Sequence, residues 1–177
     1  MTMPRKKLIA HFGIRTRRFE EMVAWFGRVL EARIQFRNSF AAFMTFDEDH
    51  HRLAIWTDDA TTEKAADAAG FDHICLELDG FEDLAGSYEN LRLEGILPAL
   101  AVNHRFTTSL YYRDPDGNEV ELSVDNFATK EEGNRYVRSP IVEQLLVPPF
   151  GDEFGPEELV AMVARGASRE ELARIGS

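Results

Sequence analysis

A unit of about fifty residues occurs twice in this chain, and this repeat limits the folds the chain can adopt. His11 precedes Phe19 by eight residues, His73 precedes Phe81 by eight residues, and each Phe is followed by two acidic residues. Each copy starts with a strand-like alternation, continues at helical spacing and ends in three further strand-like runs. A unit this small cannot enclose a core alone. The sequence therefore predicts two βαβββ modules that pair their sheets around one concave surface, an α+β fold.

The repeat also sets the expected boundaries. The first module spans about 7–57, with strands at Leu8–Arg15, Arg33–Arg37, Phe40–Phe46 and Arg52–Thr57 and a helix at Arg18–Leu30. The second spans about 71–125, with strands at Phe71–Leu78, Ile96–Val102, Thr107–Arg113 and Glu119–Val124 and a helix at Phe81–Glu94. The polar segment 58–70 is expected to link them. Together they form one domain, 1–127.

Residues 128–177 lie outside the repeat and are expected to form a C-terminal helical extension. Arg135–Val147 is predicted to be a helix or an arm, Pro156–Arg165 a helix with Pro in its first turn, and Ser168 the start of a last short helix. The sequence leaves three roles open for this extension: covering a sheet edge, binding a second subunit or closing over the site.

The composition fits a packed intracellular protein. Hydrophobic residues make up 44% of the 177 residues, which is typical of a globular domain. The net charge of −11 disfavours nucleic acid and anionic membrane surfaces as partners. The single cysteine, Cys75, cannot form an internal disulfide, and no segment reaches the length of a membrane span. We therefore expect a soluble, cytoplasmic protein without nucleic-acid or membrane partners.

A hairpin near the end of the second module presents a carboxylate. The strands Ser109–Arg113 and Glu119–Val124 flank the run Asp114–Asn118, whose Pro and Gly favour a tight turn. In the second strand, apolar residues alternate with Glu119, Glu121 and Ser123, so one face is apolar and the other is acidic.

Three residues with side chains that bind metals lie opposite an apolar stripe, each on its own strand: His11, His73 and Glu121. Two His and one carboxylate on one side of a metal leave open positions opposite, an arrangement suited to non-haem Fe(II). A single strand histidine is more often structural, but two at the same place in a repeat favour a metal site.

Three further residues could contact a substrate. By strand alternation His51, and not His50, would face the cup together with Leu53 and Ile55, where a histidine could take and return a proton. Tyr111 could donate a hydrogen bond to the substrate, and His104 lies at the approach to the same strand. The alternatives are a turn with two solvated imidazoles, a strand aromatic and a loop histidine.

With these residues, the chain resembles the vicinal oxygen chelate superfamily and, within it, the extradiol dioxygenases related to biphenyl-diol and catechol 2,3-dioxygenases. The resemblance covers about Lys7 to Phe127. It implies that His11, His73 and Glu121 are the Fe(II) ligands, and that His51, in a segment similar to HH-x-L-A, is the acid–base catalyst. His104 and Tyr111 resemble the substrate-contacting histidine and tyrosine. The well-known members carry two paired-module domains, whereas this chain has one.

The resemblance implies an Fe(II)-dependent extradiol dioxygenase of aromatic catabolism, with Mn(II) as the alternative metal. A small aromatic diol and O₂ would be its substrates. The assembly does not follow from the resemblance, because this chain has one paired-module domain; we expect a homodimer or higher homo-oligomer. Two other functions stay open. A glyoxalase-type lyase or isomerase needs a fourth ligand, typically a carboxylate on the last strand of the first module, which Leu53–Trp56 lacks. A protein of this fold can also bind a small aromatic ligand without chemistry.

Overall fold

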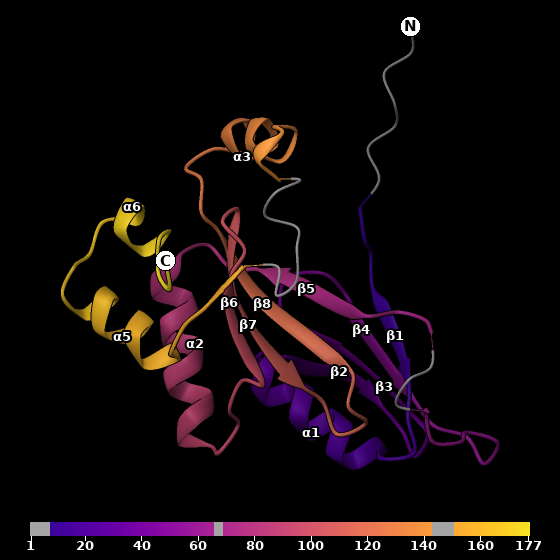
Figure 1. Ribbon diagram of the computed structural model, residues 1–177. Helices are drawn as coiled ribbons and strands as arrows, with labels where there is room; N and C mark the ends of the chain where they lie inside the picture. The colour runs from indigo at the N-terminus through magenta and orange to yellow at the C-terminus, as the bar shows by residue number, and fades with distance from the viewer. Residues whose placement is uncertain (1–7, 66–68, 143–150) are drawn as a thin grey trace, which may run out of the picture. The chain divides into compact units, whose positions relative to one another are not determined.

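The structure is a computed structural model that describes residues 8–65, 69–142 and 151–177 (Figure 1). Its residues fall into two compact units. Among the described residues, unit 1 comprises 8–65, Ala69 and the turn Asp114–Gly117, and unit 2 comprises Gly70–Arg113, 118–142 and 151–177. Within unit 1, the Arg18 guanidinium donates a hydrogen bond to Asp116 Oδ1 over 2.7 Å.

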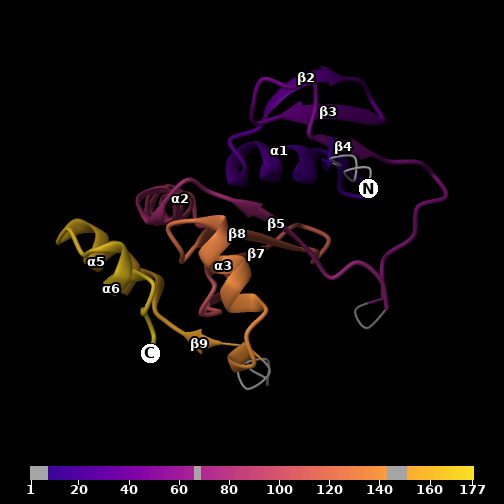
Figure 2. The same ribbon diagram turned by 90° about the horizontal axis from the view of Figure 1, so that it is seen from above.

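Unit 1 is a four-stranded sheet with one helix. Its elements are β1 (Phe12–Arg15), α1 (Phe19–Val29), β2 (Arg33–Arg37), β3 (Ala41–Thr45) and β4 (Leu53–Trp56), in the sheet order β1-β4-β3-β2. Apolar residues at helical spacing and an acidic first turn favour α1, which runs along one face of the sheet (Figure 2). Its Phe26 ring lies 6.1 Å from that of Phe12, so the sheet face that carries Phe12 forms the core.

Unit 2 repeats this arrangement and adds the C-terminal residues. Its elements are β5 (His73–Glu77), α2 (Phe81–Leu93), β6 (Leu100–Asn103), β7 (Thr107–Arg113), β8 (Glu119–Asp125), α3 (Lys130–Val137), β9 (Asp152–Glu153), α5 (Pro156–Ala164) and α6 (Arg169–Leu172). The sheet order is β5-β8-β7-β6-β9. Helix α2 ends before Gly95, whose φ of +76° suits glycine.

The two units share one topology. In unit 1, β1 pairs in parallel with β4, β4 pairs antiparallel with β3, and β3 pairs antiparallel with β2. In unit 2, β5, β8, β7 and β6 pair in the same order and the same directions. This match confirms the predicted α+β fold of two βαβββ modules with a C-terminal helical extension. The pairing of the two sheets around one surface stays a prediction.

Three predicted boundaries are wrong. The strand predicted at Leu8–Arg15 begins only at Phe12, because its partner β4 begins at Leu53, opposite Phe12. The strand predicted at Ile96–Val102 begins at Leu100, where its pairing with β7 begins. Of the helix or arm predicted at Arg135–Val147, only Arg135–Val137 lie in α3, which ends there and is followed by a turn at 138–140. This helix starts earlier than predicted, at Lys130, where Thr129 and Glu132 form a capping box. Residues 143–147 of that prediction lie outside the described residues.

The end of the chain covers one edge of the unit 2 sheet. Strand β9, which the sequence does not predict, pairs with β6 through Val102–Glu153 and Asn103–Asp152. Helix α5 lies beside α2 (Figure 1), and Leu159 on α5 is fully buried. Of the three roles that the sequence leaves open, residues 151–177 therefore take that of an edge cover.

A buried asparagine fastens this cover. Asn103 on β6 is inaccessible to solvent, and its amide nitrogen donates to the carbonyl oxygens of Ala173 and Ile175, each over 3.0 Å. Its side-chain oxygen accepts from the Arg105 N–H over 2.8 Å and from the Asn126 amide over 3.0 Å. The network satisfies polar groups that would otherwise be buried without partners.

Candidate active site

One face of the unit 2 sheet gathers most of the polar candidates. The register places Glu121 of β8 between Cys75 of β5 and Tyr111 of β7. Paired residues in neighbouring strands point to the same face, and His73 lies two residues before Cys75. His73, Tyr111 and Glu121 therefore share a face, while Val120 and Leu122 on the opposite face are buried.

His73 is held between two carboxylates. Its Nδ1 atom lies 2.6 Å from Asp72 Oδ2, and its Nε2 atom lies 3.1 Å from Glu121 Oε2. A carboxylate on one imidazole nitrogen fixes the tautomer and leaves the other nitrogen as a metal donor. The sequence prediction missed Asp72, although a carboxylate directly before a candidate ligand is a signal that could have been used.

The two glutamates of β8 have different partners. Glu119 accepts from both Nε and a terminal nitrogen of Arg113, over 3.2 and 3.1 Å, at an exposed position. Glu121 is only 5% exposed and faces His73. Glu119 is therefore engaged in a surface ion pair, and Glu121 is the carboxylate that can bind a metal together with His73.

Tyr111 and His104 form a pair on the same sheet. The Tyr111 hydroxyl lies 3.0 Å from His104 Nε2, and the Tyr111 ring meets that of His73 edge-on at 5.5 Å. Burial, and then the negative charge of Glu121, raise the pKa of Tyr111 well above that of an ordinary phenol. Tyr111 therefore keeps its proton at neutral pH and can act as a hydrogen-bond donor.

Unit 1 brings together a second group of rings. The His51 ring lies 4.7 Å from that of His11, 4.5 Å from that of His50 and 5.2 Å from that of Phe43, on which it stacks. Phe36 continues the row, 5.5 Å from Phe43. His11 and His51 are thus neighbours on the face of the sheet that carries Phe43.

The alternation argument for His51 is wrong in one respect. Leu53 and Ile55, with which His51 was expected to share a face, are fully buried on the core side. His51 precedes β4 and is not bound by its alternation, and it contacts Phe43, which pairs with Ala54 on the opposite face. The placement beside His11 therefore comes from the loop before β4.

The surroundings of His51 favour its neutral form. Burial, and then the positive charge that His50 or His11 would carry, lower the pKa of His51, while Asp49 opposes this effect. A neutral imidazole at pH 7 can accept a proton.

The equivalent position to Glu121 in unit 1 carries no carboxylate. Cys75, two residues after His73, pairs with Glu121; Gly13, two residues after His11, pairs with Ala54. Tyr111, which pairs with Glu121, likewise corresponds to Phe43, which pairs with Ala54. The repeat thus carries a thiol, a carboxylate and a phenol at these positions in unit 2 and apolar residues in unit 1.

The predicted residues lie in both units. Unit 2 brings His73, Glu121, Tyr111 and His104 together, and unit 1 brings His11 and His51 together. Over the described ranges, no three His, Cys, Asp or Glu side chains form a cluster that could hold a metal ion. The ligand set of His11, His73 and Glu121 is therefore a proposal.

Comparison with known proteins identifies the family. Residues 8–122 match the model of the glyoxalase/bleomycin resistance protein/dioxygenase superfamily. The chain belongs to this superfamily. The match spans both βαβββ modules and ends at Leu122 of β8, so the edge cover formed by residues 151–177 lies outside it.

Two relatives are similar over most of the chain. Biphenyl-2,3-diol 1,2-dioxygenase 2 of Rhodococcus globerulus is 42% identical over 132 residues, which cover 74% of this chain and 70% of that protein. Biphenyl-2,3-diol 1,2-dioxygenase 3 of the same organism is 37% identical over 166 residues, which cover 93% of this chain and 86% of that protein. These similarities support an extradiol dioxygenase.

A solved structure of the superfamily supports the fold. A glyoxylase/bleomycin resistance protein/dioxygenase domain from Frankia matches with a TM-score of 0.58 and 16% identity, covering 72% of this chain and 98% of that one. In the described parts of the chain, no helix has the length and apolarity needed to cross a membrane.

Proposed function

We propose that this chain is an Fe(II)-dependent extradiol dioxygenase that inserts both atoms of O₂ into a catechol-type aromatic diol. The observation that carries the proposal is the pair of His73 Nε2 and Glu121 Oε2, 3.1 Å apart, with Asp72 on the other nitrogen of His73. The names of the two Rhodococcus relatives point to a vicinal diol as the substrate class.

The donor set fits a divalent ion. Two donor atoms held about 2.1–2.2 Å from one metal at a right angle lie about 3.0–3.1 Å apart, which the His73–Glu121 separation matches. His11 would be the third ligand, and Mn(II) is the alternative metal. When bound, the metal would bring the diol and O₂ together, which offsets the entropy cost of their encounter.

In the proposed site, side chains of both units would bind the diol and move its protons. Neutral His51 would accept a proton from a diol hydroxyl. Tyr111, which keeps its proton, would donate a hydrogen bond to a substrate oxygen, and His104 would orient the Tyr111 hydroxyl. Phe43 and Phe36 would supply an apolar surface beside His51.

The apolar residue at Ala54 favours a dioxygenase over a four-ligand lyase. Ala54 occupies the position in unit 1 that Glu121 occupies in unit 2, so this strand offers no fourth carboxylate. A metal with three protein ligands keeps positions open for a chelating diol and for O₂.

The pH dependence of turnover tests the role of His51. Because a proton acceptor must be neutral, kcat/KM should rise with pH through an acid limb centred below the ordinary imidazole pKa of 6.5. His50→Asn should move this limb to higher pH, since it removes one of the charges that lower the His51 pKa. His51→Asn should abolish the limb and lower kcat about 10²–10⁴-fold. Equal profiles for wild type and His51→Asn would exclude this role.

Activity after anaerobic loading with iron tests the function itself. The protein, with full Fe(II) occupancy shown by elemental analysis, is expected to give a yellow ring-cleavage product with at least one member of a panel of mono- and bicyclic catechols. No product across the panel would refute the proposal. If the purified protein contains Zn or Ni and no iron, a lyase or isomerase is favoured. If it contains no metal, and His11→Ala and Glu121→Ala leave the affinity for an aromatic ligand unchanged, a binding protein is favoured.

A further inference from the structure

Arg52 stands at the junction between the two histidines of unit 1. It directly follows His51, its N–H donates to the Met44 carbonyl of β3 over 2.8 Å, and its carbonyl accepts from the Phe12 N–H of β1 over 3.0 Å. Its backbone thus connects the loop before β4 to the strands on both sides. In the HH-x-L-A segment it takes the unspecified position, to which the resemblance assigns no role.

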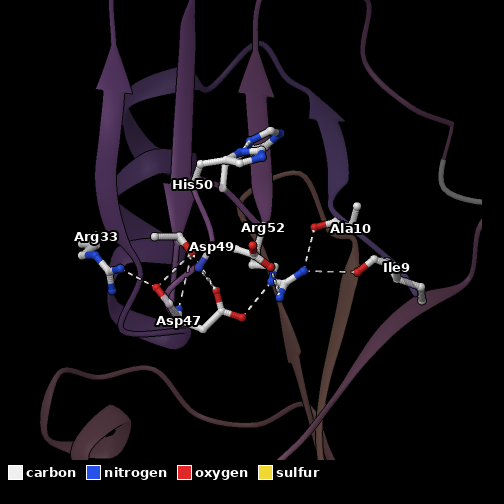
Figure 3. Close-up of polar contacts among 9 residues, drawn as sticks. Ile9, Ala10, Arg33, Asp47, Asp49, His50 and Arg52 are labelled. Carbon is white, nitrogen blue, oxygen red and sulfur yellow. Dashed lines mark hydrogen bonds and ion pairs between the residues drawn. The ribbon is translucent and has the colours of Figure 1, made fainter. Parts of the chain in front are cut away.

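The Arg52 guanidinium also binds the segment that carries His11. One terminal nitrogen donates to the carbonyl oxygens of Ala10, over 3.1 Å, and of Ile9, over 3.5 Å (Figure 3). Residues 8–11 precede β1, so their carbonyls are not held by the strand pairing that begins at Phe12. These two contacts therefore fix the backbone directly before His11.

Two carboxylates on the loop hold the other side of the guanidinium. Arg52 Nε donates to Asp47 Oδ2 over 2.7 Å, and a terminal nitrogen forms an ion pair with Asp49 (Figure 3). Asp47 is itself held, because its Oδ1 accepts from the Asp49 N–H over 2.9 Å and lies 3.1 Å from the Thr45 hydroxyl. The hydrogen bond from Arg52 lowers the pKa of Asp47, so both partners are charged at neutral pH.

We propose that Arg52 is a positioning residue that fixes the spacing of His11 and His51. The guanidinium joins the backbone before His11 to the loop before His51, and the two rings lie 4.7 Å apart. This inference rests on the proposed function, in which His11 is a metal ligand and His51 accepts a proton. Both would lose their placement together if the guanidinium were removed.

The test compares Arg52→Ala and Arg52→Lys with the wild type. In metal-free protein, nuclear Overhauser effects between the His11 and His51 rings should be lost in Arg52→Ala. Anaerobic titration with Fe(II) should show about 10–100-fold weaker binding, the loss typical of removing a group that supports a metal ligand. At saturating iron, kcat should fall by up to about 100-fold, the usual effect of a misplaced catalytic group. In Arg52→Ala, methylguanidine should restore part of the Fe(II) affinity and part of kcat. Arg52→Lys should have intermediate values of both, because an ammonium lacks the planar fork of the guanidinium.

Arg37→Ala is the matched control. Arg37 also lies in the unit 1 sheet, but its guanidinium pairs with Glu20 and lies over the Phe19 ring, so its partners are on α1 and not on the loop before β4 or residues 9–10. Its variant should keep the ring contacts, the Fe(II) affinity and kcat. Asp47→Asn should reproduce part of the Arg52→Ala loss and add little to it in the double variant, since both act through one ion pair.

The outcomes separate this inference from the proposed function. The role of Arg52 would be overturned if Arg52→Ala kept the His11–His51 ring contacts and the Fe(II) affinity of the wild type. It would also be overturned if Arg37→Ala lost as much of both as Arg52→Ala. A wild-type protein that binds iron but cleaves no catechol would refute the dioxygenase, while the ring contacts and Fe(II) affinities would still decide the role of Arg52.

Discussion

Glu121→Gln is expected to weaken Fe(II) binding by more than about 100-fold and to remove ring cleavage at sub-saturating iron. Changes that only remove support from a metal ligand already cost 10–100-fold in affinity. Glu121 is proposed to be a ligand itself, with its carboxylate 3.1 Å from His73 Nε2. The amide of glutamine has the same shape but loses the negative charge that balances a dication.

The variant should fold as well as the wild type. Glu121 is almost fully buried, and in metal-free protein its carboxylate faces an imidazole nitrogen that is also an acceptor unless it carries a proton. The glutamine amide can donate to that nitrogen, so the thermal unfolding temperature of the metal-free variant should be equal or higher. A loss of iron affinity would then report on coordination and not on unfolding.

Glu119→Gln is the control for this experiment. Glu119 lies two residues away on the same face of β8, but it pairs with Arg113 at an exposed site. Its variant should bind Fe(II) within about twofold of the wild type, because exposed ion pairs contribute little. Anaerobic titration with Fe(II) measures both variants, and wild-type affinity in Glu121→Gln would show that Glu121 is not a ligand.

The sequence predicts those parts of the fold that local patterns determine. Arg33–Arg37 and Thr107–Arg113 have the predicted bounds, and turn residues mark the end of each strand: Asn38-Ser39 after the first and Asp114–Asn118 after the second. The repeat also places His73 and Glu121 on one face, since the period of a strand is two residues.

Features that depend on partners distant in sequence could not be predicted. The strand at Leu8–Arg15 is shortened because β4 has no residue to pair before Leu53. His51 does not follow the alternation of β4 because it lies in the loop before that strand. Arg52 binds backbone carbonyl oxygens, and a pattern of side-chain types does not reveal such contacts. Strand β9 has two residues and exists only through its pairing with β6.

Asn103→Ala is expected to destabilise unit 2 by about 3–5 kcal/mol and to release the end of the chain from the sheet. The substitution removes partners from the Ala173 and Ile175 carbonyls, the Arg105 N–H and the Asn126 amide. A buried polar group left without a partner costs about 1–3 kcal/mol, and the groups nearest to solvent recover part of that by hydration. Urea unfolding measures the total.

Asn103→Asp separates the fastening of the chain end from the rest of the network. A carboxylate keeps the acceptor for Arg105 and Asn126 but, when ionised, turns an oxygen toward the Ala173 and Ile175 carbonyls. This variant should recover stability as the pH falls, because a protonated carboxyl can donate to one of these carbonyls. Hydrogen exchange in residues 169–175 should be faster than in the wild type at neutral pH and slower again in acid.

Asn134→Ala provides the matched control. Asn134 is an exposed residue of α3, a position where alanine has the higher helix propensity, so stability should be unchanged or slightly raised. If Asn103→Ala were as stable as this control, with unchanged exchange at Ile175, the asparagine would not fasten the edge cover. The burial of Leu159, Leu172 and Ile175 would then suffice to hold residues 151–177 on the sheet.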